Sequence, residues 1–236
     1  MSRILALGDI HGCLTAMQTV LKAAKLSDDD LLIGLGDYVD RGPDTASVLD
    51  WIIDRQASGK FVALRGNHEL MMLDAFDDPI SRHNWETVGG KQTLDSYRAC
   101  GLSGELNEIL ESHRRFLRLE TLPWYETAGH FFVHANAFPD VPLDEQPDFM
   151  LYWERWDRPA RHMSGKVMVC GHASLRGGLP ETNGDSICID TGVYRESGWL
   201  TCLDVETGRY WQANQQGESR SGWLIELEDD CDFEDN

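Results

Sequence analysis

Long hydrophobic runs are missing from this chain, and their absence excludes several classes of protein. The apolar run near the N-terminus, Ile4 to Leu7, is too short for the hydrophobic part of a signal peptide. No stretch approaches the roughly 20 apolar residues that a membrane-spanning helix needs. We therefore expect a soluble protein without a membrane partner.

Paired cysteines are also missing. The chain has six cysteines, none of which lies in a CxxC pair, and several lie within apolar runs. A reduced cysteine in such a run behaves as a small core residue. This pattern predicts a reducing, cytoplasmic compartment.

Positive charge is scarce, with 21 Lys and Arg against 40 Asp and Glu and a net charge of −19. A negative mean field repels phosphate backbones, so we expect no nucleic-acid partner. The same field repels a phosphorylated substrate. Any phosphate site in this chain therefore needs local positive charge from metal ions or arginines.

Short apolar runs alternate with amphipathic segments along the chain. The pattern predicts strands at 3–8, 31–36 and 61–64 with helices at 14–24 and 45–57 between them, which is a layered α/β arrangement. Residues 77–122 are expected to form a helical cap. Further strands are expected at 131–133, 167–169 and 186–189, followed by antiparallel hairpins over 200–227.

These segments predict one domain over residues 1–225. Residues 226–236 include seven acidic side chains and are expected to form a disordered tail. The sequence leaves the oligomeric state open.

Three of the predicted strands end in motifs that carry metal-ligand side chains. These motifs are GDIHG at 8–12, GDYVDRG at 36–42 and GNHE at 66–69. Because the carboxyl ends of parallel strands meet at one edge of a sheet, we expect their polar side chains to lie together. Two later apolar runs also end in a histidine, so the candidate ligands are Asp9, His11, Asp37, Asn67, His134 and His172.

This ligand set predicts a pair of transition-metal ions. Carboxylates, imidazoles and an amide oxygen suit Mn²⁺, Fe or Zn²⁺ better than the all-oxygen shell of Ca²⁺. The number of ligands is sufficient for two ions. Asp37, from the central motif, is the natural bridge between them.

The motif set resembles that of the calcineurin-like metallophosphoesterases. The GDxVDRG and GNHE forms resemble the phosphoprotein phosphatase (Ser/Thr phosphatase) branch, especially its short bacterial and phage members. The segments MLYWER at 150–155 and IDTG at 189–192 resemble further motifs of that branch, so the resemblance covers about residues 3–203. It implies an α+β metallo-dependent phosphatase fold, with a central β-sandwich of two mixed sheets flanked by helices.

The resemblance also implies a role for each motif residue. One metal would be held by Asp9, His11 and Asp37, and the other by Asp37, Asn67, His134 and His172. A hydroxide bridging the two ions would attack phosphorus. The remaining motif residues would complete the catalysis, with His68 protonating the leaving oxygen, Asp40 orienting His68, and Arg41 and Arg155 binding phosphate oxygens.

Two of these assignments leave alternatives. The native ions are expected to be Mn²⁺, with Fe or Zn²⁺ as alternatives. Arg158 and Arg161 follow Arg155 closely, so a surface salt bridge is the alternative role for Arg155.

Three functions follow from the resemblance. The first is hydrolysis of phosphomonoesters, on phosphoserine or phosphothreonine of a protein or on a small phosphoester. The second is hydrolysis of diadenosine tetraphosphate by the same metal core. The third, an inactive phosphate-binding module, is disfavoured because no predicted ligand and no predicted acid is missing.

Overall fold

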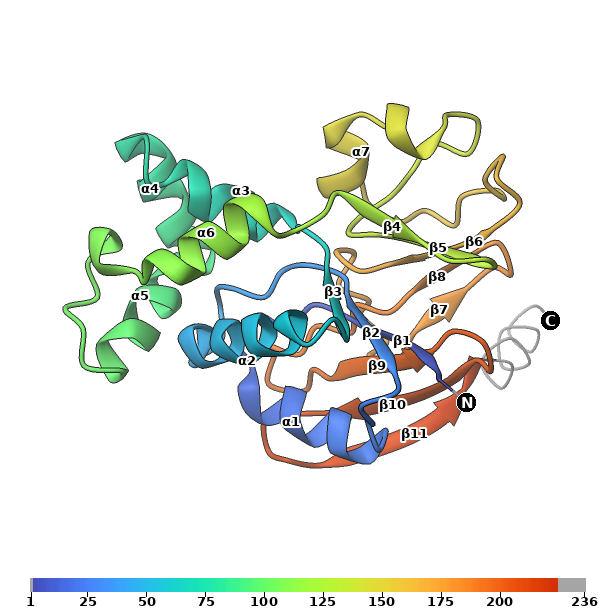
Figure 1. The fold of residues 1–236 in the computed structure, drawn as a ribbon, viewed down its shortest axis with the longest axis horizontal. Coiled ribbons are helices and arrows are strands. Elements are labelled where there is room, and N and C mark those ends of the chain that lie inside the picture. Colours follow the sequence, from blue (N-terminus) through green and yellow to red (C-terminus); the bar gives the residue numbers. More distant parts are fainter. Residues whose placement is uncertain (1, 225–236) are drawn as a thin grey trace.

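The computed structural model describes residues 2–224, so the predicted acidic tail at 226–236 lies outside the described residues. Two mixed sheets stack as a sandwich, with helices on its outer faces and at one end (Figure 1). This arrangement confirms the predicted α+β fold of two mixed sheets flanked by helices.

The first sheet combines parallel and antiparallel strands in the order β11-β10-β9-β1-β2-β3. Its strands are β1 (Ile4–Leu7), β2 (Leu31–Gly34), β3 (Phe61–Ala63), β9 (Leu200–Asp204), β10 (Arg209–Ala213) and β11 (Ser219–Trp223). Strands β1, β2 and β3 are parallel and are joined by helices α1 (Leu14–Ala23) and α2 (Thr45–Ala57). The predicted C-terminal hairpins are the antiparallel strands β9 to β11.

The second sheet has the order β4-β5-β6-β8-β7, with β5, β6 and β8 parallel. Its strands are β4 (Trp124–Glu126), β5 (His130–Val133), β6 (Val167–Cys170), β7 (Glu181–Thr182) and β8 (Ser186–Cys188). The sequence pattern did not predict the edge strands β4 and β7. Both are short and only partly buried, so they carry no apolar alternation that marks a strand.

Side chains alternate across the first sheet in the way a strand requires. Leu5 and Leu7 of β1 face helices α1 and α2, whereas Ala6 between them faces the second sheet. Ala6 packs in a cluster with Phe132 of β5 and Val169 of β6, all fully buried. This packing brings the carboxyl ends of parallel strands from both sheets to the same end of the sandwich.

A helical segment gathers at that end (Figure 1). It comprises α3 (Asn67–Asp74), α4 (Pro79–Trp85), a π-helical turn (Glu86–Gly90), α5 (Lys91–Ala99), a 3-10 turn (Leu106–Glu108) and α6 (Glu111–Leu119). Buried His113 ties the segment to α2, because Nδ1 accepts from the Tyr97 hydroxyl at 2.7 Å and Nε2 donates to Asp50 at 2.9 Å. The segment is therefore fixed against the first sheet.

A 3-10 turn (Leu143–Glu145) and helix α7 (Asp148–Tyr152) lie against the second sheet. None of the helices within residues 2–224 is both long and apolar enough to cross a bilayer. The five cysteines in this range are all free thiols.

Candidate metal centre

The predicted ligands come together just after the parallel strands of both sheets. The loops after β1 and β2 and the start of helix α3 after β3 supply one half of the centre, and the loops after β5 and β6 supply the other half. The side chains gathered there are Asp9, His11, Asp37, Asn67, His68, His134 and His172, and all but His172 are buried.

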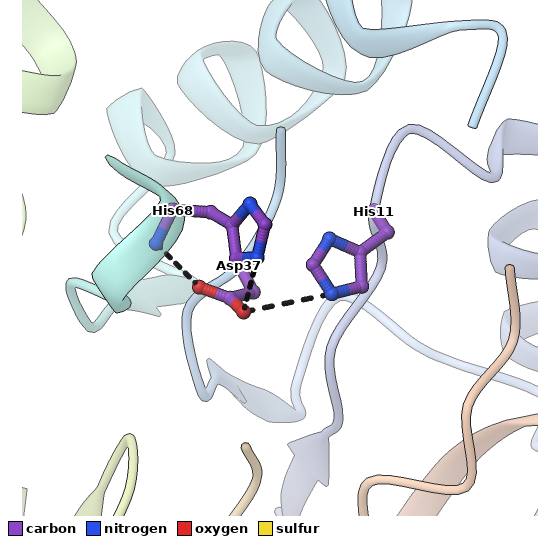
Figure 2. A group of neighbouring side chains, drawn as sticks. All are labelled: His11, Asp37 and His68. Atoms are coloured by element: carbon purple, nitrogen blue, oxygen red, sulfur yellow. Dashed lines mark hydrogen bonds and ion pairs between the residues drawn. The ribbon is translucent and has the colours of Figure 1, made fainter. Parts of the chain in front are cut away.

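Asp37 lies between two clusters of metal-ligand atoms. On one side its Oδ2 atom is 3.5 Å from Nε2 of His11 and 4.0 Å from Nε2 of His68, and Figure 2 shows both imidazoles near this carboxylate. On the other side its Oδ1 atom is 3.5 Å from Nε2 of His134. In each cluster of three, the ligand atoms lie within 4.8 Å of one another.

Asn67 completes the second cluster. Its Oδ1 atom is 2.9 Å from Nε2 of His134 and 3.1 Å from Nδ1 of His172. His172 belongs to this cluster together with Asp37 and His134. One carboxylate thus faces both clusters with different oxygens, which is the geometry of a bridging ligand.

Backbone carbonyls orient the histidines. Nδ1 of His11 donates to the carbonyl of Val39 at 2.9 Å, and Nδ1 of His134 donates to that of Leu35 at 2.8 Å. Nε2 of His172 donates to the carbonyl of Trp153 at 3.1 Å. Metal-binding histidines commonly donate their second N–H in this way, so the ring keeps its lone pair on the other nitrogen, the one that would bind a metal.

The pKa values separate His68 from two of the other histidines. Burial lowers the pKa of His11 well below its usual value, and burial together with His134 lowers the pKa of His172 to about 4. Burial also opposes a charge on His68, but the carboxylates of Asp37 and Asp40 outweigh it and raise that pKa. His11 and His172 are therefore suited to bind metal as neutral ligands, and His68 is suited to carry a proton.

Asp9 lies beside the centre but outside both clusters of described side chains. Its carboxylate accepts the backbone N–H of His172, with 3.1 Å to Oδ2, and a side chain on Gly171 would collide with its Oδ1 atom. Burial, and then the charges of Asp190 and Asp37, raise the pKa of Asp9 well above its usual value. A cation would relieve this repulsion between buried carboxylates, so the donor set fits a metal centre.

Glu69 shapes the loop that carries Asp37. Its carboxylate accepts the N–H groups of Asp37, Tyr38 and Gly66 at 2.8 Å each. Asp37 itself has a φ of 51°, a left-handed conformation that is unfavourable without such support. Glu69 therefore supports the loop that positions the Asp37 carboxylate.

Asp40 is fully buried and connects His68 to the helical segment. Its Oδ2 atom accepts from Nδ1 of His68 at 2.7 Å and from Nε1 of Trp85 at 2.9 Å. Its Oδ1 atom accepts from the hydroxyl of Thr93 at 2.8 Å. Trp85 is the last residue of α4 and Thr93 is in α5, so this segment positions the orienting carboxylate.

The two predicted arginines line one cavity of about 590 Å³ beside His172. Nη1 of Arg41 is 2.8 Å from Nε2 of His11, and its guanidinium lies 4.3 Å from the ring centre of Tyr194. Within residues 2–224 Arg155 forms no ion pair, so the structure offers no salt bridge for it. Arg41 therefore contacts a candidate ligand directly, whereas Arg155 shares with His172 the lining of the adjoining cavity.

Sequence reasoning gave no role to several residues that shape this centre. Glu69 stands inside the GNHE motif, and its position three residues after Gly66 is a signal of N-terminal helix capping that could have identified it. Trp85, Thr93 and Tyr194 have no such signal, because only the folded chain brings them to Asp40 and Arg41.

Comparisons with known proteins agree with this geometry. The family model of the calcineurin-like phosphoesterases matches residues 2–200. The serine/threonine-protein phosphatase 2 of Salmonella typhimurium is 30% identical over 204 residues, which cover 81% of this chain and 88% of that protein. A symmetrical bis(5'-nucleosyl)-tetraphosphatase of Chromobacterium violaceum is 29% identical over 167 residues, which cover 65% of this chain and 52% of that protein.

Among solved structures, the cold-active protein-tyrosine phosphatase of a psychrophilic Shewanella species has the same fold. The TM-score is 0.63 with 19% sequence identity, and the match covers 94% of this chain and 80% of that one. With the family model, the relatives and the donor clusters around Asp37 taken together, the chain belongs to the calcineurin-like phosphoesterases, metal-dependent enzymes that hydrolyse phosphoesters at a binuclear centre.

Proposed function

We propose that this chain is a phosphoserine/phosphothreonine protein phosphatase that uses two Mn²⁺ ions. The observation that carries the proposal is the double cluster around Asp37, with the His68–Asp40 pair and an arginine-lined cavity next to it. The Salmonella Ser/Thr phosphatase supports this substrate class, because its similarity extends over 88% of that protein. The tetraphosphatase relative is matched over only 52% of its length.

In this proposal Asp9, His11 and Asp37 hold one ion, and Asp37, Asn67, His134 and His172 hold the other. When bound, the ions would lower the pKa of the attacking water and neutralise charge on the phosphate. The lowered pKa values of His11 and His172 support their roles as ligands. The raised pKa of His68 and its bond to Asp40 support its exclusion from the ligand set.

The protein groups then act on the substrate as follows. Arg41 and Arg155 bind the phosphate oxygens that do not react, since planar guanidinium groups match the geometry of phosphate. As the bond from phosphorus to the serine or threonine oxygen breaks, Nε2 of His68 gives its proton to that oxygen. The side chain of Asp40 accepts Nδ1–H of His68 at 2.7 Å and keeps the imidazole in place.

A dinucleoside polyphosphate hydrolase is the second candidate, favoured by the similarity to the Chromobacterium tetraphosphatase. The experiment that separates the two measures kcat/KM with Mn²⁺ on a phosphoserine peptide and on diadenosine tetraphosphate. We expect the peptide to be the better substrate. A preference for the tetraphosphate by orders of magnitude would refute the protein phosphatase assignment.

A separate assay tests whether the chain is instead an inactive phosphate-binding module. Turnover of p-nitrophenyl phosphate by the Mn²⁺-loaded protein is expected. Complete absence of turnover with two ions bound per chain would support a module that binds phosphate without cleaving it.

A further inference from the structure

We propose that Arg176 and Arg195 form a second anion-binding subsite beside the catalytic centre, which recognises a carboxylate or a second phosphate near the phosphorylated residue of a peptide substrate. The inference rests on the proposed protein phosphatase function and adds a preference for acidic phosphopeptides. It is carried by the concentration of arginines in one cavity, by the hydrogen bonds that anchor the loops holding them, and by the lack of an acidic partner for Arg176 and Arg195 within residues 2–224.

The cavity next to the centre is strongly cationic. Its wall includes Arg41, Arg155, Arg158, Arg176 and Arg195, against two carboxylates, those of Asp157 and Glu181. The chain as a whole has a net charge of −19, yet five arginines line this one cavity. Such a local reversal of sign attracts an anionic ligand.

Only one of these arginines is neutralised within residues 2–224. Nη2 of Arg158 lies 3.1 Å from Oε2 of Glu181, whereas neither Arg176 nor Arg195 forms an ion pair in that part of the chain. Both are exposed, so their guanidinium groups are open to a ligand. Arg41 and Arg155 are already assigned to the phosphate that reacts, which leaves Arg176 and Arg195 for another anion.

Tyr194 connects Arg195 to the phosphate site. The guanidinium of Arg41 lies 4.3 Å from the centre of the Tyr194 ring, and that of Arg195 lies 5.7 Å from the same centre. The ring also meets the imidazole of His11 edge-on, with 5.1 Å between centroids. One aromatic ring, that of Tyr194, therefore separates Arg195 from Arg41, the arginine assigned to the phosphate that reacts.

Buried Asp190 holds both arginine-bearing loops. Its Oδ2 atom accepts the N–H of Ser174 at 2.6 Å, two residues before Arg176. Its Oδ1 atom accepts the N–H of Gly192 at 2.9 Å, and the carbonyl of Gly192 accepts the N–H of Arg195 at 2.9 Å. The loops that present Arg176 and Arg195 thus share one anchor, which fixes the subsite relative to the metal centre.

Two sources supply a second anion close to a phosphate. One is a phosphopeptide with a neighbouring acidic or phosphorylated residue, and the other is the remaining phosphate chain of a dinucleoside polyphosphate. The similarity to a Ser/Thr phosphatase over most of both chains favours the peptide. The experiment therefore includes both a phosphopeptide and a dinucleoside polyphosphate as substrates.

The experiment compares kcat/KM for two phosphoserine peptides that differ only in neutral or acidic flanking residues. The enzyme is the full chain with Mn²⁺, and diadenosine tetraphosphate is the third substrate. The quantity compared is kcat/KM for the acidic peptide divided by kcat/KM for the neutral peptide. We expect this ratio to be about 10-fold lower in the Arg176→Ala/Arg195→Ala variant than in the unmodified enzyme, because two exposed charge pairs contribute a few-fold each. Added salt should reduce the ratio of the unmodified enzyme in the same direction.

The control variant is Arg115→Ala, an exposed arginine of α6 that pairs with Glu120 and lies outside the cavity. It should leave the ratio unchanged. A charge reversal, Arg195→Glu, should shift the preference toward lysine-flanked phosphopeptides. An unchanged ratio in the double variant, or an effect on the tetraphosphate alone, would overturn the proposal.

A binding measurement separates failure of the subsite from failure of the proposed function. Fluorescence anisotropy of a labelled acidic phosphopeptide, recorded with EDTA, needs no turnover. Weaker binding to the double variant than to Arg115→Ala supports the subsite even if no phosphopeptide is hydrolysed. Equal binding to the two variants overturns the subsite even if hydrolysis is fast.

Discussion

Replacement of Trp85 by phenylalanine tests how the helical segment supports catalysis. Trp85 is fully buried at the end of α4, and its indole N–H reaches both oxygens of Asp40 at 3.0 and 2.9 Å. Asp40 in turn accepts Nδ1–H of His68. Trp85→Phe keeps an aromatic ring in the core but removes this donor from a buried carboxylate.

The size of the effect on stability follows from these contacts. A hydrogen bond to a charged group contributes about 1.5–3 kcal/mol, and the smaller ring leaves space worth about 1 kcal/mol more. For a chain of this length, such a loss lowers Tm by roughly 5–15 °C. Thr93 still donates to Asp40 at 2.8 Å, so we expect the variant to fold.

The effect on catalysis should appear in kcat. With one of its anchors gone, Asp40 holds His68 less firmly, and we expect kcat to fall by about 10-fold, less than the ~10²–10⁴-fold that a general acid can contribute. KM should change little, because Arg41 and Arg155 are assigned to the phosphate. The assay is steady-state turnover of p-nitrophenyl phosphate at a temperature where both proteins are folded.

Trp51→Phe is the matched control. Trp51 of α2 packs against Phe61 and lies outside the centre, so its replacement should affect stability without a specific loss of kcat. If Trp85→Phe lowers Tm but leaves kcat within twofold of the unmodified enzyme, the segment only stabilises the fold. The inferred positioning of His68 through Asp40 would then be wrong.

Three further predictions concern single side chains. His68→Asn should lower kcat by ~10²–10⁴-fold with two metal ions retained, as measured by turnover and metal analysis, and loss of metal would identify His68 as a ligand. Asp37→Asn should release both ions together, and retention of two would disprove bridging. Asp30→Asn should lower the free energy of unfolding at pH 7 by about 1–3 kcal/mol, because Asp30 accepts three bonds from Arg3 and that pairing holds its pKa well below the usual range. Because the pKa of Asp30 is lower in the folded state, its contribution to stability is fully present above the unfolded-state pKa of about 4 and declines as the pH falls below that value. The difference in free energy of unfolding between the variant and the unmodified protein, measured by urea denaturation, should therefore narrow as the pH falls through about 4. A difference that stays constant with pH would contradict the assignment.

Local signals explain which parts of the fold could be predicted from the sequence. Strands β1, β2 and β3 each combine a short apolar run with a glycine-containing motif, so both the strand and the polar motif that follows it could be predicted from the sequence. The edge strands β4 and β7 were missed because their pairing depends on β5 and β8, not on their own residues.

For the candidate site, too, some features could be predicted from the sequence and others could not. The meeting of His11, Asp37 and His134 follows from the rule that parallel strand ends converge. That the first cluster contains His68 and leaves Asp9 outside depends on how the folded loops place these side chains, which no residue pattern specifies. The roles of Trp85 and Tyr194 depend on tertiary contacts alone, so they were visible only in the folded chain.

A binuclear enzyme would hold one ion in each of the clusters on either side of Asp37. An anomalous difference map from crystals grown with Mn²⁺ measures the number and positions of the bound ions. We expect two peaks roughly 3.5–4 Å apart, one next to His11 and the other next to His134 and His172. A single peak, or none near Asp37, would contradict a binuclear centre.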